Sequence, residues 1–309
     1  MRTLDLDGLI PATLTPMTDT FEVDERALRN YIRWMLGFDG LKGVAVNMDT
    51  GEGPHLTGDE KRAIISIWKE EAKNKLPILA GISGPSTANA IREARDAEEA
   101  GADGLVIFPI PAYAGQPLPA EVPLRYHEAI ADAVGIPLVL FQLQPSLSGV
   151  IFTPETLERL LEIDSVIAIK EASFDTVTFV NTAELVRRAS RKITVLTGND
   201  NFILESFMLG ADGALIGFGT IAVAEQIKMI DLAKANDFSE ALRIYRETVR
   251  PLALGIFSEP VRNYRARLKE ALVMLGILEN SEMRPPILPL DEAEKEMVRE
   301  LLKEVGMLE

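Results

Sequence analysis

The chain has 309 residues, of which 47% are hydrophobic and 26% charged, a composition with enough apolar side chains for a large core. Its net charge of −15 disfavours nucleic acids and anionic membranes as partners, because the overall field repels them. The chain has no cysteine and only two histidines, which excludes disulfides and thiolate chemistry and argues against a histidine-rich metal site.

The amino-terminal residues lack the basic start and apolar core of a signal peptide. No apolar run reaches the roughly eighteen residues that a membrane span needs. We therefore expect a cytoplasmic protein with no membrane or nucleic-acid partner, no metal and no cofactor.

Eight short apolar runs alternate with longer amphipathic stretches along the chain. The runs are nearly continuous in Val, Ile, Leu and Ala, which is typical of parallel strands that are covered on both faces. The predicted strands are residues 8–13, 43–47, 77–81, 104–108, 137–141, 166–169, 193–196 and 213–216.

The amphipathic stretches between these runs predict helices. Residues 57–60, Thr-Gly-Asp-Glu, have the pattern of a capping box that opens a helix. The sequence Gly-Ala-Asp-Gly at 101–104, which recurs at 210–213, predicts a helix end that leads into the next strand. The predicted helices are residues 24–35, 61–72, 88–100, 120–133, 154–162, 175–188, 200–209 and 222–235.

Eight strand–helix units in this order predict an α/β fold, a closed (β/α)8 TIM barrel. A doubly wound open sheet is the alternative, but its nucleotide-binding versions lack support because the chain has no glycine-rich phosphate motif. Helical patterns continue beyond the eighth unit at 241–255, 260–275 and 291–305. We therefore expect a barrel of residues 1–236 and a C-terminal helical extension of residues 237–309 packed on it.

Lys170 ends the sixth predicted strand, at the edge of a barrel where catalytic residues gather. An apolar strand end disfavours the ammonium, so the pKa should fall, and the neutral amine could then attack a carbonyl to form a Schiff base. A lysine that ends a strand with its head in water is the alternative. Polar segments at 49–52, 141–144 and 198–200 end other strands and favour the catalytic interpretation.

Several short motifs occur in a characteristic order over the whole chain. They are Gly8–Pro16, Thr50–Glu52, Ala80–Gly81, Pro145–Ser146 with Gly149, Ile169–Ser173 and Thr197–Asp200. In order and spacing the chain resembles the dihydrodipicolinate synthase/N-acetylneuraminate lyase family of class I aldolases. The resemblance implies a TIM barrel, usually a homotetramer built as a dimer of dimers, and a lysine that forms a Schiff base with pyruvate or another 2-oxo acid. By position that lysine is Lys170.

The resemblance also implies where the substrate binds. In the family, hydroxyls and backbone amides after the second strand hold the carboxylate of the 2-oxo acid, which here implies Thr50 and Gly51. The backbone near Gly198 and Leu215 matches positions that line the pocket in relatives. A turn glycine and a strand core residue are the alternative interpretations of these two.

The second-strand loop departs from the family pattern at Asp49, which replaces a hydroxyl residue. A carboxylate there would repel an anionic substrate unless it is protonated, turned away or paired with a cation. A loop-capping aspartate is the alternative.

The fifth strand and its loop also depart from the pattern. The family carries a proton-relaying tyrosine where alignment places Gln142, and an amide cannot relay a proton as an acid or base. The arginine that helps synthase-type relatives to bind a dicarboxylic partner is replaced by Leu147. Tyr113, after the fourth strand, is a candidate proton relay, and a surface loop tyrosine is the alternative.

These departures lead us to expect a Schiff-base lyase that acts on a small-molecule 2-oxo acid, and not dihydrodipicolinate synthase proper. A pyruvate-type aldolase and a 2-keto-3-deoxy sugar acid dehydratase are the two forms considered. A catalytically silent 2-oxo acid binding protein and a PLP-dependent barrel enzyme stay open as alternatives. The predicted site consists of Lys170 as the nucleophile, Tyr113 as the relay, and the substrate contacts Asp49, Thr50, Gly51, Gln142, Gly198 and Leu215.

Overall fold

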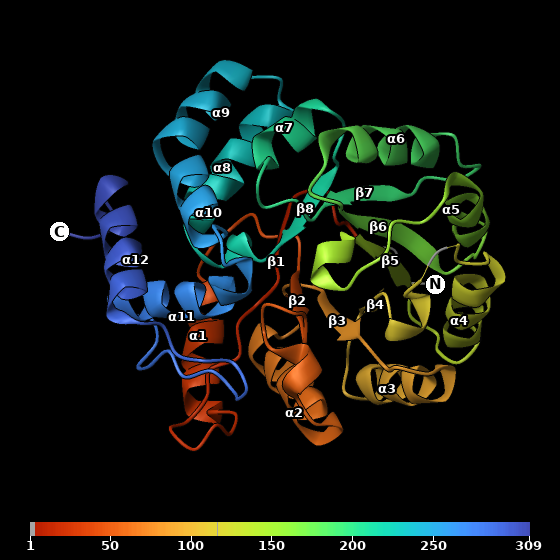
Figure 1. Ribbon diagram of the computed structural model, residues 1–309, viewed down its shortest axis with the longest axis horizontal. Coiled ribbons are helices and arrows are strands. Elements are labelled where there is room, and N and C mark those ends of the chain that lie inside the picture. The colour runs from red at the N-terminus through yellow and green to blue at the C-terminus, as the bar shows by residue number, and fades with distance from the viewer. Residues whose placement is uncertain (1–3, 116) are drawn as a thin grey trace.

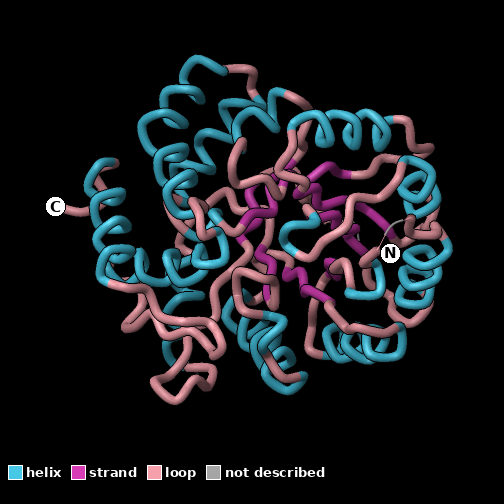
Figure 2. Tube along the Cα trace, viewed as in Figure 1, coloured by secondary structure: helices cyan, strands magenta, loops and turns pink. Residues whose placement is uncertain are grey.

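The computed structural model describes residues 4–115 and 117–309 (Figure 1). Figure 2 shows the strands gathered at the centre, with helices around them. The strands are β1 (Leu9–Pro11), β2 (Val44–Val46), β3 (Ile78–Ile82), β4 (Gly104–Ile107), β5 (Leu138–Leu143), β6 (Val166–Ala172), β7 (Thr194–Thr197) and β8 (Gly213–Ile216).

The eight strands form one parallel sheet that closes on itself. Hydrogen-bonded neighbours follow the order β1-β8-β7-β6-β5-β4-β3-β2. An isolated parallel bridge between Ala12 and Ala45 then joins β1 to β2, and the Thr13 amide donates to the Ala45 carbonyl at 2.9 Å. The prediction of a (β/α)8 TIM barrel is confirmed.

Within the described residues, one α-helix follows each strand, and four further α-helices follow the last of these. The barrel helices are α1 (Glu25–Met35), α2 (Gly58–Ala72), α3 (Thr87–Glu99), α4 (Glu121–Ala131), α5 (Pro154–Leu161), α6 (Thr176–Arg187), α7 (Ile203–Met208) and α8 (Val223–Lys234). The C-terminal helices are α9 (Phe238–Ile244), α10 (Arg250–Ile256), α11 (Tyr264–Met274) and α12 (Glu292–Glu304).

The local signals for helix ends act as the sequence predicts. Thr57 caps α2, where its hydroxyl accepts the Glu60 amide and the Glu60 carboxylate accepts the Thr57 amide. Gly101 and Gly210 follow α3 and α7 with φ of 101° and 107°, which a glycine adopts without a steric cost. After each glycine, the next amide donates to the carbonyl five residues earlier and closes the helix end.

The predicted helix 241–255 is interrupted in the structure. A π-helical turn, Tyr245–Val249, separates α9 from α10. Pro251 lies in the first turn of α10 and has no amide hydrogen to donate to the carbonyl four residues earlier. The wider π turn before it accommodates this missing bond.

Two hydrophobic layers stabilise the barrel. One lies between the sheet and the surrounding helices, and the other fills the barrel interior with inward side chains such as Ile10, Val106, Phe141 and Leu215. Figure 1 shows α9–α12 together along one side, with α9 packed on α8 and α12 on α10 and α11. The boundary at residue 236 stays a prediction. Within the described ranges, no helix combines the length and apolar character needed to cross a bilayer.

Candidate active site

Lys170 points into the barrel from the carboxyl end of β6. Successive side chains of a strand face opposite sides, and Ala168 and Ala172 both belong to the interior cluster. Lys170 shares their side, and it is only 8% exposed. The strand therefore places a primary amine at the inner rim of an apolar barrel.

The surroundings of Lys170 leave its amine without a committed partner. Its Nζ lies 4.2 Å from the ring centroid of Phe141, its register partner on β5. Among the residues that the structure describes, none forms a hydrogen bond or ion pair with this Nζ. Gly198 makes room for the side chain, since a Cβ there would lie 2.8 Å from Lys170 Cε and 2.8 Å from Ala172 Cβ.

Asp200 is the buried carboxylate whose charge acts on Lys170. Burial lowers the pKa of Lys170 to about 8, although the charges of Asp200 and Asp49 oppose this shift. Burial likewise raises the pKa of Asp200 to about 7, against the effects of the Phe218 amide, at 2.9 Å, and of Lys170. The two groups titrate together, so each can hold or release a proton near neutral pH.

A cavity of about 520 Å³ opens above these two residues. Its walls combine the loops after several strands with the C-terminal helical segment. The lining residues include Asp49, Thr50, Phe108, Phe141, Leu147, Lys170, Gly198, Asp200, Phe257, Tyr264 and Arg265. Aromatic and aliphatic side chains dominate this lining and surround a few charged groups, a combination that is typical of small-molecule sites.

Asp49 is paired with a cation, one of the three conditions under which a carboxylate could be tolerated here. The Arg265 guanidinium donates through Nε at 3.1 Å and through Nη2 at 3.0 and 2.8 Å to the two carboxylate oxygens. The Tyr264 hydroxyl donates to Asp49 Oδ2 at 2.7 Å, and the Tyr264 ring stacks on Phe257. The charge of Asp49 is therefore offset within the cavity wall.

A buried ion pair holds the same loop from the other side. Glu52 and Lys269 have side chains that are 0% and 1% exposed, with Lys269 Nζ 2.6 Å from Glu52 Oε1. Nζ also donates to the Glu282 carbonyl at 2.6 Å. Because Lys269 lies on α11, this pair fixes the loop after β2 to the C-terminal helices.

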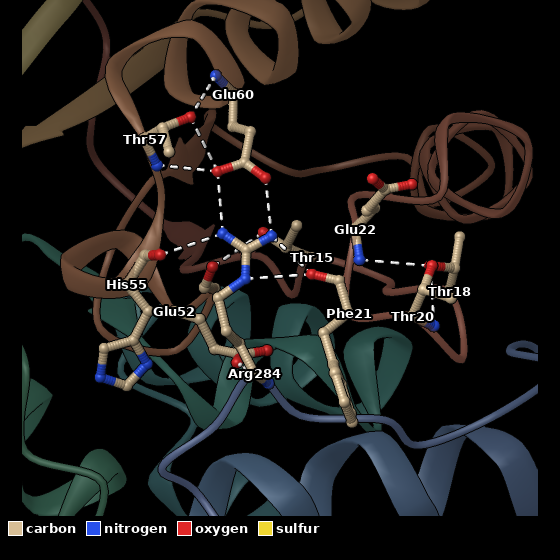
Figure 3. A network of polar contacts seen from close by, with 11 residues as sticks. Thr15, Thr18, Thr20, Phe21, Glu22, Glu52, His55, Thr57, Glu60 and Arg284 are labelled. Carbon is tan, nitrogen blue, oxygen red and sulfur yellow. Dashed lines mark hydrogen bonds and ion pairs between the residues drawn. The ribbon is translucent and has the colours of Figure 1, made fainter.

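Arg284 extends this connection to the start of α2 (Figure 3). Its amide donates to Glu52 Oε2 at 2.8 Å, and its guanidinium forms a bidentate pair with Glu60 at 2.6 and 2.8 Å. It also donates to the carbonyls of His55 and Phe21. The loop that carries Asp49 and Thr50 is thus held on both sides by residues from the C-terminal region.

The structure brings four of the predicted site residues together around one cavity: Lys170, Asp49, Thr50 and Gly198. Gly51 lies in the same loop but outside the lining. Its amide donates to the Met48 carbonyl at 3.1 Å, so this donor is used within the turn. The Thr50 amide, in contrast, has no partner among the residues described.

Three predicted site residues lie away from the cavity. The Gln142 side chain is on the outer face of β5, where it donates to Glu171 at 3.2 Å and to Thr182 at 2.8 Å. Strand alternation explains this placement, because the adjacent Phe141 takes the inward position facing Lys170. Leu215 is buried in the barrel core, below the cavity lining.

Tyr113 is the third of these residues. It was predicted as a proton relay, with a surface loop tyrosine as the alternative, but its side chain is buried away from the cavity. Its ring packs edge-on against Tyr126 and Phe152. Burial raises its pKa, and its hydroxyl has no hydrogen-bond partner within the described chain. A relay role for Tyr113 therefore has no support from its position.

The cavity side chains that sequence reasoning missed include Phe141, Asp200, Tyr264 and Arg265. Asp200 was within reach, since it ends one of the recognised motifs and follows a strand. Tyr264 and Arg265 come from the first turn of α11, where no local pattern marks them as facing the barrel. In the described residues, no group of three or more His, Asp or Glu side chains could hold a metal ion.

Comparisons with known proteins agree over the whole length of the chain. A sequence profile of the Dihydrodipicolinate synthetase family matches residues 5–305. A 4-hydroxy-tetrahydrodipicolinate synthase of Syntrophobacter fumaroxidans is 31% identical over 301 residues, covering 97% of this chain and 99% of the relative. One from Pelobacter propionicus is 32% identical over 302 residues, with the same coverage.

Solved structures show the same similarity. A dihydrodipicolinate synthase from Thermotoga maritima has a TM-score of 0.89 at 26% identity and covers 98% of this chain and 99% of its own. The dihydrodipicolinate synthase of Acinetobacter baumannii complexed with pyruvate has a TM-score of 0.86 at 28% identity, with 98% and 99% coverage.

These relatives confirm two sequence-based predictions and contradict a third. The resemblance to the family is confirmed. The prediction of a Schiff-base enzyme that is a carbon–carbon or a carbon–oxygen lyase is also confirmed, and the family has the carbon–carbon type. The prediction of a 2-oxo acid lyase that is not dihydrodipicolinate synthase is wrong. Relatives about 30% identical over nearly the full length carry that synthase name.

Proposed function

This chain belongs to the dihydrodipicolinate synthetase family, and on that premise we propose that it condenses pyruvate with an aldehyde, as a 4-hydroxy-tetrahydrodipicolinate synthase does. The observation that carries the proposal is the Lys170 amine, which is buried, faces the cavity and forms no ion pair in the described chain. Its lowered pKa provides neutral amine near neutral pH, and a neutral amine is the nucleophile that a Schiff base needs.

The product name of the relatives supports a proposal for the second substrate. A tetrahydrodipicolinate has seven carbons, one ring nitrogen and two carboxylates. If pyruvate supplies three carbons and one carboxylate, the partner is a four-carbon aldehyde with an amino group and the other carboxylate. That compound is 2-amino-4-oxobutanoate.

The loop after β2 supports binding of pyruvate beside Lys170. The Thr50 amide, which has no partner among the described residues, and the Thr50 hydroxyl, which also interacts with the Tyr264 hydroxyl, line the same cavity as Lys170. They are neutral donors that could hold the pyruvate carboxylate. With the carboxylate there, the neutral Lys170 amine adds to the C2 carbonyl. Loss of water then gives the protonated imine.

Asp200 is the group best placed to move protons in the following steps. The protonated imine acidifies the methyl group, and loss of a methyl proton to the Asp200 carboxylate gives the enamine. The enamine carbon then attacks the aldehyde carbon, and the proton returns to the new alkoxide. The amino group of the partner finally attacks the imine carbon, which closes the ring and releases the Lys170 amine.

Borohydride trapping tests the first half of this reaction. Incubation with pyruvate, reduction and peptide mass spectrometry should give a carboxyethyl group on Lys170. The variant Lys170→Met should give no adduct in that peptide. Absence of the adduct in the unaltered protein at pH 8 to 9, where the amine is neutral, would exclude the proposed function.

The assembly and the location follow from the resemblance and the composition alone. We propose a homotetramer, as is usual in the family, and a cytoplasmic enzyme. Light scattering of the purified protein and fractionation of the source cells are the measurements that decide each of these.

A further inference from the structure

The cavity contains a second cation besides the nucleophile. Of the described residues that line it, two carry a positive charge, Lys170 and Arg265. Lys170 is consumed by the Schiff base in the proposed reaction. Arg265, with a side chain that is 17% exposed, remains available to an anionic group in the cavity.

The geometry of Arg265 leaves one edge of its guanidinium free. Nε and Nη2 are bound to the Asp49 carboxylate, whereas Nη1 has no hydrogen-bond partner in the described part of the chain. Asp49 is itself fixed by the Tyr264 hydroxyl at 2.7 Å. The planar guanidinium is therefore held in one orientation, which reduces the conformational cost of forming another charged hydrogen bond.

The loop after β5 brings no cation to the cavity. Leu147, which stands where the synthase-type pattern has an arginine, lines the wall with an apolar side chain. A partner carboxylate near Leu147 would lose water without gaining a hydrogen bond there. Arg265, on α11, supplies the charge that this loop lacks.

We propose that Arg265 binds the carboxylate of the aldehyde that condenses with the pyruvate imine, and that it thereby selects carboxylate-bearing aldehydes. Asp49 is the positioning residue that orients the guanidinium. This inference rests on the proposed function. Arg265 donates to the partner carboxylate through Nη1, on the edge that Asp49 leaves free. An arginine–carboxylate hydrogen bond in a partly buried site gives strong selectivity.

The experiment compares two aldehydes that differ only in the carboxylate, 2-amino-4-oxobutanoate and 3-aminopropanal. In Arg265→Met, the KM for 2-amino-4-oxobutanoate should rise at least about tenfold, while kcat/KM for 3-aminopropanal changes little. Arg265→Lys keeps the charge but loses the fork, so its KM should lie in between. Arg262→Met, an exposed arginine three residues away and outside the lining, is the matched control and should behave as the unaltered protein.

The pyruvate adduct on Lys170 distinguishes a failure of the Arg265 inference from a failure of the proposed function. If the adduct forms and Arg265→Met impairs both aldehydes equally, Arg265 only joins α11 to the β2 loop and the inference is overturned while the function stands. The same conclusion follows if the KM for 2-amino-4-oxobutanoate is unchanged in both Arg265 variants. If the unaltered protein forms no adduct, or condenses neither aldehyde, the proposed function fails and the inference fails with it.

Discussion

Two lysines of this protein, Lys170 and Lys269, are both buried, but only Lys269 forms an ion pair in the described chain. Lys269 Nζ donates hydrogen bonds to the Glu52 carboxylate and to the Glu282 carbonyl, both at 2.6 Å. Lys170 faces an aromatic ring at 4.2 Å and a cavity, and no ion pair fixes it in the described chain. Burial lowers the pKa of both lysines, and nearby carboxylates oppose the shift at each. At Lys269 the opposing carboxylate, Glu52, also accepts a hydrogen bond from the amine, whereas no such bond forms at Lys170 in the described chain.

The difference shows how the same side chain serves structure in one place and chemistry in another. A buried ammonium with full hydrogen bonding is held as a charge and cannot act as a nucleophile. A buried amine without a partner is destabilised as a charge and becomes reactive. The partner, more than the burial, separates the two roles.

Replacing the unpaired lysine should have the largest effect on activity. Lys170→Met should lower condensation of pyruvate with 2-amino-4-oxobutanoate by about 10⁴-fold or more, because no other described amine lines the cavity. Its stability should be unchanged or higher, since an unpaired buried amine is removed. Steady-state kinetics and thermal unfolding measure both effects. Residual activity above about 1% would show that Lys170 is not the nucleophile.

Replacing the paired lysine should affect stability instead. Lys269→Met leaves Glu52 as an uncompensated charge that is 0% exposed, so the free energy of unfolding should fall by about 3–5 kcal/mol. The double variant Glu52→Gln with Lys269→Met should recover much of this loss, because no charge is left buried. Urea unfolding of the single and double variants gives the comparison. A single variant as stable as the unaltered protein would contradict the contrast between the two lysines.

The sequence predicts the barrel well because its signals are local. Eight apolar runs, a capping box and two glycine helix ends each depend on a few neighbouring residues. The position of Lys170 follows from the same reasoning, because the carboxyl ends of all strands of a parallel barrel lie at the same face. A residue at the end of a predicted strand is therefore expected at that face. The π-helical turn before α10 is the kind of detail that a helical pattern alone misses.

The contents of the cavity depend on features that are not local. A shift of one residue along β5 exchanges the inward and outward faces, so the alignment that selected Gln142 missed Phe141. Arg265 and Asp49 form an ion pair although they are 216 residues apart in the sequence, and no local pattern near either residue predicts this pair. The synthase was wrongly excluded because Gln142 and Leu147 replace the family's tyrosine and arginine in the sequence. Residues from other parts of the chain can face the same cavity, so the absence of these two side chains does not exclude the activity.

Crowding the unpaired lysine should reduce activity less than Lys170→Met does and stability less than Lys269→Met does. A Cβ at Gly198 would come within 2.8 Å of both Lys170 Cε and Ala172 Cβ, and the Ala172 atom belongs to a strand that cannot move freely. Gly198→Ala should therefore lower the free energy of unfolding by about 1–3 kcal/mol and slow adduct formation. Gly58→Ala is the matched control, because a Cβ there meets nothing within 4 Å. Equal behaviour of the two variants in urea unfolding would contradict the close packing around Lys170.

The smallest expected effect is a displacement of the pH profile, and it tests the electrostatic part of the contrast. The rate of borohydride-trapped adduct formation should rise with pH through about 8, as Lys170 loses its proton and becomes the nucleophile. The Asp200 carboxylate raises the pKa of Lys170, so Asp200→Asn should lower that pKa and move the midpoint to lower pH.

The direction of this displacement distinguishes an electrostatic partner from a structural one. If Asp200 only caps the Phe218 amide, the Asn variant keeps an acceptor oxygen there and the midpoint should not move. If the Asp200 charge raises the pKa of Lys170, the midpoint should fall in the Asn variant. The loss of later proton transfers in this variant does not affect the measurement, because trapping reports only the formation of the imine. Asp132→Asn, at an exposed aspartate after α4, should leave the midpoint in place. A midpoint that stays in place or rises in Asp200→Asn would contradict the assignment of this carboxylate as the group that raises the pKa of Lys170.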